Sequence, residues 1–458
     1  MALDFKSKLR LLDASGSGGT GLPSALSGSG APGDRSHPQR EASSSTRAPP
    51  PSSWSKADRI AQLRALMQEV AERPRACPDR AASGTEVPLP GELRSTTHGP
   101  IQLVEEFLEP SHRHGQVAIR DALDVDGTLV AKLALEPELA GVDFSRMVIL
   151  DTETTGLSIA SGTVPFLIGV AWFEDQSLCV QQLFLRRPGE EVPILQFLAD
   201  RLRWASCLVT YNGKTFDWPL LRARYVLNRV PMVEPPAHLD LLHCARRIYR
   251  RRLQRVRLVH LEEAVLGMCR EYDVDGAEIP RLYLDYLRRG EAGPLTGVIE
   301  HNVNDLVALA AILAKMSRHF ARVVRSDDPR DHLSYAKLAV RSKDPVRARA
   351  FAEAAADGGG DSGVTVEALL LAATLARRRK DLPEEEQALE EAVEKGGEHP
   401  ILGPTVHLAA AKCFEHRSKN FSRALVHAAR TAPLEGPAGQ EKRMARLRRR
   451  LARASEDS

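Results

Sequence analysis

A short apolar segment that ends abruptly in acidic residues constrains the fold of this chain more than any other feature. Residues 147–156 are MVILDTETTG, so four apolar, β-prone residues are followed directly by Asp151, Thr152 and Glu153. This pattern is typical of a buried strand that carries polar groups at its carboxyl end. Because side chains alternate along a strand, Asp151 and Glu153 are expected on the same face. Two carboxylates so close repel each other, and Mg²⁺ or Mn²⁺, which prefer oxygen ligands, would relieve that repulsion.

Taken alone, the pattern is also explained by a strand followed by a polar turn that ends at Gly156. A metal site therefore depends on carboxylates from distant parts of the chain. One candidate is Asp217, which follows the predicted strand 207–211 after the sequence NGKTF. Its position suits an N-cap, because Pro219 fits the first turn of a helix. It also lies beyond the carboxyl end of a strand, where open α/β sheets bind ligands.

The other candidate is Asp305, in the segment 294–316, which has helical periodicity. His301 lies one helical turn before Asp305, so the two side chains share a face. Apolar residues run close to that face, which is expected to direct both polar side chains inward. A buried histidine is often only a hydrogen-bonded core residue, but beside an acidic site we favour a catalytic role for His301.

Composition and periodicity divide the chain into regions. Residues 1–55 are rich in Ser, Gly, Pro and Ala and are predicted to be a disordered, low-complexity segment. Residues 56–140 are predicted to contain a short amphipathic helix and a β-rich prelude. Over 141–325, three adjacent strands, a helix, a fourth strand and further helices predict an α/β domain with helices against a sheet.

After this domain the strand signals vanish, and 331–435 contains three similar Ala-rich helical hairpins. Their polar turns begin at Lys343, Lys380 and Lys419, which are 37 and 39 residues apart and close to the tetratricopeptide (TPR) period. We expect an all-α domain of TPR-like repeats, with a plain helical bundle as the alternative. Such repeats offer a concave surface to a protein partner, or they simply cover the preceding domain. A basic C-terminal tail, 436–458, follows.

Composition also narrows the class of protein. The six cysteines are scattered without a Cys-x-x-Cys pair, which indicates neither a zinc site nor a disulfide framework. The first residues lack the apolar core of a signal peptide, and no apolar run approaches the ~18 residues of a membrane span. We therefore expect a cytoplasmic protein without a membrane partner. Seven arginines between Arg246 and Arg257 are candidate phosphate contacts, unless they form a solvated helix face.

The candidate residues belong to three short motifs: Asp151-x-Glu153, Asn212-x-x-x-Phe216-Asp217 and His301-x-x-x-Asp305. In this order they resemble the exonuclease motifs of the DEDD group of ribonuclease-H-like 3′→5′ exonucleases. Intervening segments such as FLIGVAWF and LVTYNGKTFDWPLL are similar to the YprB-type predicted exonucleases, bacterial proteins that join this domain to TPR-like repeats. The resemblance covers about residues 90–320. It implies that 141–325 is a ribonuclease-H-like exonuclease domain, with a mixed sheet flanked by helices.

The resemblance also implies roles for individual residues. Two Mg²⁺ or Mn²⁺ ions would be held by Asp151, Glu153, Asp217 and Asp305. The water that attacks the phosphate would be positioned or deprotonated by His301. The expected contacts to single-stranded DNA or RNA are Asn212, Lys214, Phe216, Arg250 and Arg251, with the phenyl ring acting by stacking or as a wedge.

One departure from the family pattern concerns His301. The tyrosine subclass of DEDD enzymes has Tyr-x-x-x-Asp and the histidine subclass has His-x-x-x-x-Asp, whereas this chain has a histidine at the tyrosine spacing. A neutral imidazole can act as a general base. Its reach and height above the metal ions need not match those of a phenol, so the departure bears on the role of His301.

The expected function is metal-dependent hydrolysis of phosphodiester bonds by a 3′→5′ exonuclease. Two alternatives stay open. One is a weak or inactive nucleic-acid-binding scaffold that recruits protein partners through its helical repeats. The other is an endonuclease that acts on structured nucleic acid. The sequence does not distinguish DNA from RNA as the substrate.

Overall fold

The structure, a computed structural model, describes residues 88–156, 162–359 and 361–456. The chain divides into two compact units, Met1–Trp54 and Ser55–Ser458, and all described residues belong to the second. The low-complexity segment predicted at 1–55 and the amphipathic helix predicted after it lie outside the described residues.

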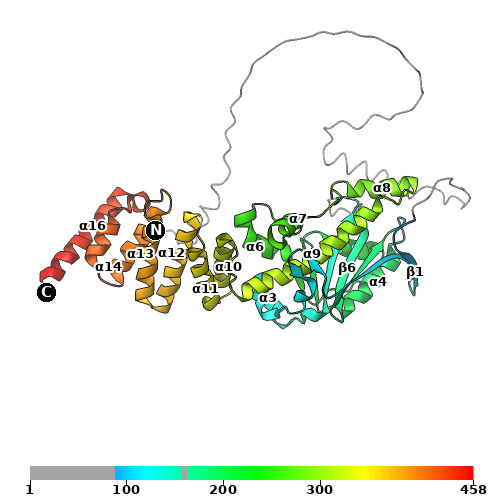
Figure 1. The fold of residues 1–458 in the computed structure, drawn as a ribbon, viewed down its shortest axis with the longest axis horizontal. Coiled ribbons are helices and arrows are strands. Elements are labelled where there is room, and N and C mark those ends of the chain that lie inside the picture. Colours follow the sequence, from blue (N-terminus) through cyan, green and yellow to red (C-terminus); the bar gives the residue numbers. More distant parts are fainter. Residues whose placement is uncertain (1–87, 157–161, 360, 457–458) are drawn as a thin grey trace, which may run out of the picture. The chain divides into compact units, whose positions relative to one another are not determined.

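A seven-stranded mixed sheet, in the order β1-β2-β7-β6-β5-β8-β9, organises the region up to residue 240 (Figure 1). Neighbours from β1 to β5 pair antiparallel, whereas β5, β8 and β9 run parallel. The strands are β1 (Glu92–Thr96), β2 (Gly99–Leu108), β5 (Met147–Thr154), β6 (Pro165–Glu174), β7 (Ser177–Phe184), β8 (Cys207–Thr210) and β9 (His238–Asp240). A separate two-stranded ladder joins β3 (Arg113–His114) to β4 (Val117–Ala118). The predicted β-rich prelude therefore supplies two strands to the sheet of the following domain.

The apolar residues of β5 are buried on both faces of the sheet. Met147 and Ile149 enter one hydrophobic core and Val148 and Leu150 enter another, and none of the four is exposed. This double burial explains the continuous apolar run, since a strand with one solvated face would alternate. Burial of each such side chain contributes about 1.5–3 kcal/mol, so the strand that carries the acidic residues is firmly fixed.

Helices cover both faces of the sheet. The core around Val148 and Leu150 is closed by α4 (Glu191–Trp204), α5 (Asp217–Leu227) and α8 (Ile279–Arg289). The core around Met147 and Ile149 is closed by α3 (Gly127–Ala134), α6 (Leu241–Leu253) and α9 (Leu295–Ala321). Three short 3₁₀ turns lie before β5: Ile119–Ala122, Pro137–Gly141 and Phe144–Arg146.

Helix α9 runs past the carboxyl end of β5. Its first turns place Val298 and Ile299 in one core, whereas the part from Leu306 onward lies in the other. By length and composition alone α9 is apolar enough to cross a membrane, contrary to our expectation that no apolar run approaches that length. However, 67% of its most apolar window is buried inside the protein, as in a core helix.

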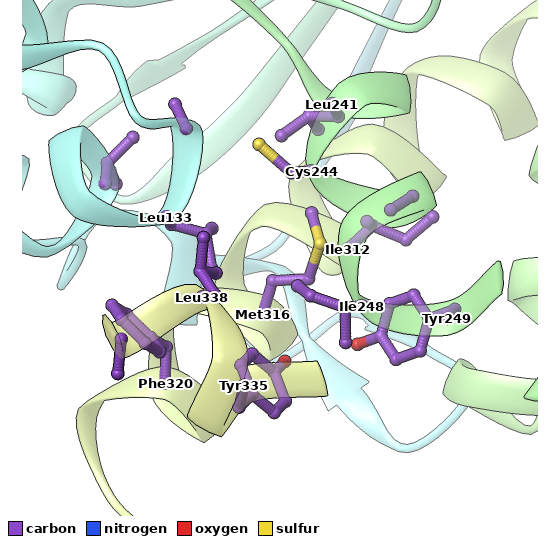
Figure 2. Packing of buried hydrophobic residues seen from close by; sticks show 14 of the residues in the cluster. Leu133, Leu241, Cys244, Ile248, Tyr249, Ile312, Met316, Phe320, Tyr335 and Leu338 are labelled. Atoms are coloured by element: carbon purple, nitrogen blue, oxygen red, sulfur yellow. The ribbon is translucent and has the colours of Figure 1, made fainter. Parts of the chain in front are cut away.

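The core that α9 completes continues into the helical region. Figure 2 shows Leu133, Ile248, Ile312 and Tyr335, from α3, α6, α9 and α10, packed in one cluster. The helices of this region are α10 (Pro329–Arg341), α11 (Pro345–Asp357), α12 (Ser362–Arg379), α13 (Leu382–Gly396), α14 (Gly403–His416), α15 (Phe421–Ala428) and α16 (Ala432–Glu456). The predicted all-α region is thus confirmed, and its description as TPR-like repeats stays a prediction. The predicted basic tail forms most of α16.

The three predicted hairpin turns share one local structure. Lys343, Lys380 and Lys419 each adopt a positive φ, between 56° and 63°. The residue that follows each lysine caps the next helix, its side chain accepting a hydrogen bond from a backbone N–H. These residues are Asp344, Asp381 and Asn420. The recurring Lys-Asp/Asn pair therefore marks a chain reversal and a helix start, two local properties that sequence encodes directly.

Gly169 lets α9 approach the sheet. It lies on β6 opposite Asp151 of β5. A Cβ atom at Gly169 would lie 2.1 Å from Oδ1 of Asn302 and 2.8 Å from Cδ1 of Leu306. Asn302 is fully buried and donates a hydrogen bond to Asp151, with an Nδ2–Oδ2 distance of 2.9 Å. Gln182 holds the amide of Asn302 from the other side, donating to Oδ1 at 2.9 Å.

Replacing Gly169 by alanine should therefore push α9 away from β5 and β6. We expect Gly169→Ala to lower the free energy of unfolding by about 1–3 kcal/mol, the usual cost of overpacking a core. The measurement is denaturant unfolding followed by circular dichroism. Gly141→Ala is the matched control, because a Cβ there meets no atom within 4 Å. Equal stability of the two variants would contradict this account of the close approach.

Candidate functional site

The four predicted carboxylates come together beside the carboxyl end of β5. Because β5 and β8 are parallel neighbours, the segment that follows β8 reaches the same edge of the sheet as Asp151. Helix α5 begins there with Asp217, and α9 brings Asp305 from the other side. Burial, followed by the negative charges of Asp305, Asp217 and Glu153, raises the pKa of Asp151 well above its usual value.

The pKa values of the other three carboxyls are raised as well. Burial, with repulsion from Asp305 next in size, raises the pKa of Glu153 to about 8. Burial raises the pKa of Asp217 to about 6, although a hydrogen bond from Thr152 opposes the shift. Burial also raises the pKa of Asp305, against the attraction of Arg270 and His301. Carboxyls that hold protons so firmly indicate a shortage of positive charge in their surroundings.

Three of the four carboxylates already have a close partner from the protein. Asp151 accepts from Asn302, Asp217 accepts from the hydroxyl of Thr152, and Asp305 pairs with Arg270 at 2.5 Å between Oδ1 and Nη2. In the part of the chain that the structure describes, no group of three or more His, Cys, Asp or Glu side chains is arranged to hold a metal ion. The chemistry of the donor set nevertheless fits Mg²⁺ or Mn²⁺, because all four groups offer hard oxygen donors.

The position of Asp217 decides between its two interpretations. The N-cap of α5 is Phe216, and Asp217 is the first helical residue, so the interpretation of Asp217 as an N-cap is wrong. Its side chain points to Thr152 of β5 instead, and the residue is only 5% exposed. Asp217 therefore faces the site.

His301 lies at the rim of the same cluster. Its Nε2 atom is 3.7 Å from Oε1 of Glu153 and 3.8 Å from Oδ2 of Asp305. Its Nδ1 atom is hydrogen-bonded to Oδ1 of Asp273 at 2.7 Å. The imidazole is thus within reach of two carboxylates despite the unusual spacing of the motif.

Two of the residues predicted to contact nucleic acid are engaged within the protein. Lys214 pairs with both carboxylate oxygens of Glu136, at 2.7 and 2.8 Å. Asn212 has a φ of 68°, and its side chain accepts a hydrogen bond from Thr215, as expected for a turn residue. Phe216 is half-buried where α5 begins.

The arginine-rich segment divides into two groups. Arg251 pairs with Glu367 of α12 through two bonds of 3.0 and 3.1 Å, and Arg252 pairs with Asp331 of α10 at 2.9 Å. These side chains bind the helical region. By contrast, Arg246 and Arg250 are exposed and have no ion pair among the described residues.

Sequence reasoning missed several polar residues that complete the cluster. Asn302 and Thr152 lie inside the predicted motifs, directly beside His301 and Asp151 in the sequence, and this position was a usable signal. Arg270 and Asp273 come from the segment between α7 (Leu258–Leu261) and α8, which has no periodic pattern. No local feature of the sequence indicates that they reach the site.

Comparison with known proteins gives two matches. A family model described as the RNase_H superfamily matches residues 148–317, which include all four carboxylates and His301. The chain is also similar to "Uncharacterized protein YprB" of Bacillus subtilis (strain 168). The two are 31% identical over 359 residues, which make up 77% of this chain and 85% of the relative. The similarity therefore extends well beyond the superfamily domain.

The raised pKa of Glu153 predicts a dependence of stability on pH. The ordinary pKa of a glutamate is 4.5, and that of Glu153 in the folded protein is about 8. Between these two pH values the folded protein holds a proton that the unfolded chain has lost. The contribution of Glu153 to the free energy of unfolding therefore falls as the pH rises through this window. Without metal, the free energy of unfolding of Glu153→Gln relative to that of the parent should therefore increase by up to a few kcal/mol between pH 5 and pH 9. Each pKa unit corresponds to about 1.4 kcal/mol.

The measurement is urea unfolding at several pH values in the presence of a chelator. Glu138→Gln, a change at an exposed glutamate, is the control. Parallel stability curves for the parent and Glu153→Gln would contradict a Glu153 carboxyl that stays protonated in the folded protein.

Proposed function

Because this chain belongs to the YprB family and contains an RNase_H-superfamily domain, a nuclease-type fold, we propose that it is a metal-dependent 3′→5′ exonuclease. Its proposed substrate is single-stranded DNA or RNA, in which it hydrolyses phosphodiester bonds. The observation that carries the proposal is the convergence of Asp151, Glu153, Asp217 and Asp305 from three elements, each carboxyl with a raised pKa. Such a cluster is costly for the fold, and a cation-dependent reaction gives a reason for it.

The proposed chemistry assigns a task to each side chain. The four carboxylates would hold two Mg²⁺ or Mn²⁺ ions, which supply a nucleophilic water and stabilise charge on the phosphate. His301 directs Nε2 toward Glu153 and Asp305, where it can accept a proton from that water. Asn302 and Thr152 orient Asp151 and Asp217 through hydrogen bonds. Phe216, half-buried at the start of α5, is the candidate surface for a terminal base.

Cleavage of end-labelled strands tests this function. The purified protein should release mononucleotides from the 3′ end of single-stranded DNA or RNA with Mn²⁺ or Mg²⁺, and not with EDTA. Asp151→Asn and Asp305→Asn should lower the rate by at least ~10³-fold, since each removes an anionic oxygen from the site. Asp175→Asn, at an exposed turn between β6 and β7, is the control and should keep full activity. Cleavage of a circular strand would instead identify an endonuclease, and equal rates for all three variants would refute the carboxylate site.

A second candidate function is a nucleic-acid-binding scaffold without turnover. The ion pair between Arg270 and Asp305 favours it, because a guanidinium already neutralises one of the four carboxylates. In this case the helical region would recruit protein partners, and strands would bind in EDTA as well as they do with metal. Binding without any cleaved product, under all the conditions above, would select this function.

The division of the arginines predicts which of them meet the phosphate backbone. Tyr211, directly after β8, donates a hydrogen bond from its hydroxyl to the carbonyl of Val256 at 2.6 Å, which joins the chain after α6 to the segment that leads to Asp217. Arg250→Gln should weaken binding of a single strand and reduce the slope of log K against log [salt] by about 0.7, the value for one phosphate contact. Arg251→Gln is the matched control, because Arg251 pairs with Glu367. The measurement is fluorescence anisotropy over a salt series, and equal slopes for the two variants would contradict the division.

A further inference from the structure

The segment from residue 267 to residue 275, here called the 267–275 loop, brings two charged side chains to the candidate site. It begins at Gly267, whose φ of 66° ends a π-helical turn at Glu262–Leu266, and it ends before α8. π-Helical turns are rare and are frequent at functional sites. The loop carries Arg270 and Asp273.

Arg270 fixes this loop in place. Its side chain is only 3% exposed and makes ion pairs with Glu262 at 2.7 Å, Asp273 at 3.2 Å and Asp305 at 2.5 Å. Glu262 is fully buried and is also bonded to Nε2 of His114 at 2.7 Å. A guanidinium with three carboxylate partners has little freedom to move, because Nε, Nη1 and Nη2 are all engaged. Asp273 is therefore held from one side by Arg270.

The other oxygen of Asp273 holds His301. Arg270 binds Oδ2 of Asp273, whereas Nδ1 of His301 lies 2.7 Å from Oδ1. An ionised carboxylate only accepts hydrogen bonds, so the imidazole must donate through Nδ1–H. In the neutral ring this leaves Nε2 without a proton, directed at Glu153 and Asp305. This nitrogen is then free to act as the base that the proposed reaction needs.

We propose that Asp273 is a positioning residue for His301. The Asp273 carboxylate selects the Nδ1–H tautomer of His301 and directs its Nε2 atom to the carboxylate cluster. The inference rests on the proposed nuclease function. It also explains how His301 can be oriented although it stands at the spacing of the tyrosine subclass: the orientation comes from a carboxylate of another segment. A purely structural role, in which Asp273 only anchors the loop through Arg270, makes no demand on the tautomer of His301.

The tautomer of His301 gives a direct test on the full-length, metal-free protein. With ¹⁵N-labelled histidine, long-range ¹H–¹⁵N correlation spectra distinguish the Nδ1–H and Nε2–H forms, and His301→Gln assigns the signal among the 14 histidines. The parent should show Nδ1–H. Asp273→Asn should lose this preference, because its amide can donate to Nδ1 as well as accept from it. Asp275→Asn is the matched control, since the Asp275 carboxylate accepts from the backbone N–H of Ala277 instead.

Kinetics on 3′-labelled single-stranded DNA and RNA with Mn²⁺ completes the test. Asp273→Asn should lower kcat by ~10²-fold, the usual contribution of an oriented general base, with KM unchanged. Asp275→Asn should match the parent.

The outcomes separate this inference from the function on which it rests. Loss of the tautomer preference together with a fall in kcat alone supports the positioning role. An Nε2–H form of His301 in the parent overturns the positioning role without the need for any variant. A changed tautomer in Asp273→Asn with unchanged kcat overturns it as well. A parent that cleaves no strand refutes the proposed nuclease, and the catalytic role of Asp273 falls with it, whatever the tautomer. A parent that cleaves while His301 keeps one tautomer in both proteins refutes only the positioning role.

Discussion

The crowding of four carboxylates with limited access to water is the constraint on which the rest of this site depends. Burial raises the pKa of all four, and repulsion from the other carboxylates of the cluster adds to the shift at Asp151 and Glu153. A hydrogen bond to a charged group contributes about 1.5–3 kcal/mol, and a whole domain is stable by only about 5–15 kcal/mol. The bonds from Asn302, Thr152 and Arg270 are therefore large relative to the margin of the fold. The cluster can be maintained only on a rigid support.

The support is β5 and the elements packed on its two faces. The strand lies between two hydrophobic cores, so neither face can shift without disturbing apolar contacts. Helix α9 passes through both cores and comes close to β6 at Gly169, which lets the buried amide of Asn302 reach Asp151. The same packing that stabilises the domain thus sets the positions of the polar groups.

The arginines between Arg246 and Arg257 lie in different environments although they are close in sequence. Arg251 and Arg252 form ion pairs with α12 and α10, and the apolar core of α9 extends to Tyr335 of α10. The helical region is therefore joined to the sheet-containing region by apolar and ionic contacts together. Arg250, adjacent in sequence to Arg251, is exposed and has no ion pair among the described residues. On a helix, neighbouring residues point in different directions, so a run of like residues does not share one environment.

Sequence alone determined the local features of this protein, and only the tertiary structure decided how its polar groups are paired. The apolar run before Asp151, the shared face of Asp151 and Glu153, and the hairpin turn at Lys343 follow from strand alternation and turn chemistry, which act over a few residues. The places of Asp217 after a strand and of Asp305 on a helix made them candidates, and similarity to a known family gave them the role of metal ligands. The pairing of Arg270 with Asp305 and of Asp273 with His301 joins residues 35 and 28 positions apart, and the segment that carries Arg270 and Asp273 has no periodic pattern. Such pairs depend on the distance between folded segments. For this reason Lys214 and Arg251, predicted to contact nucleic acid, proved to be paired with Glu136 and Glu367.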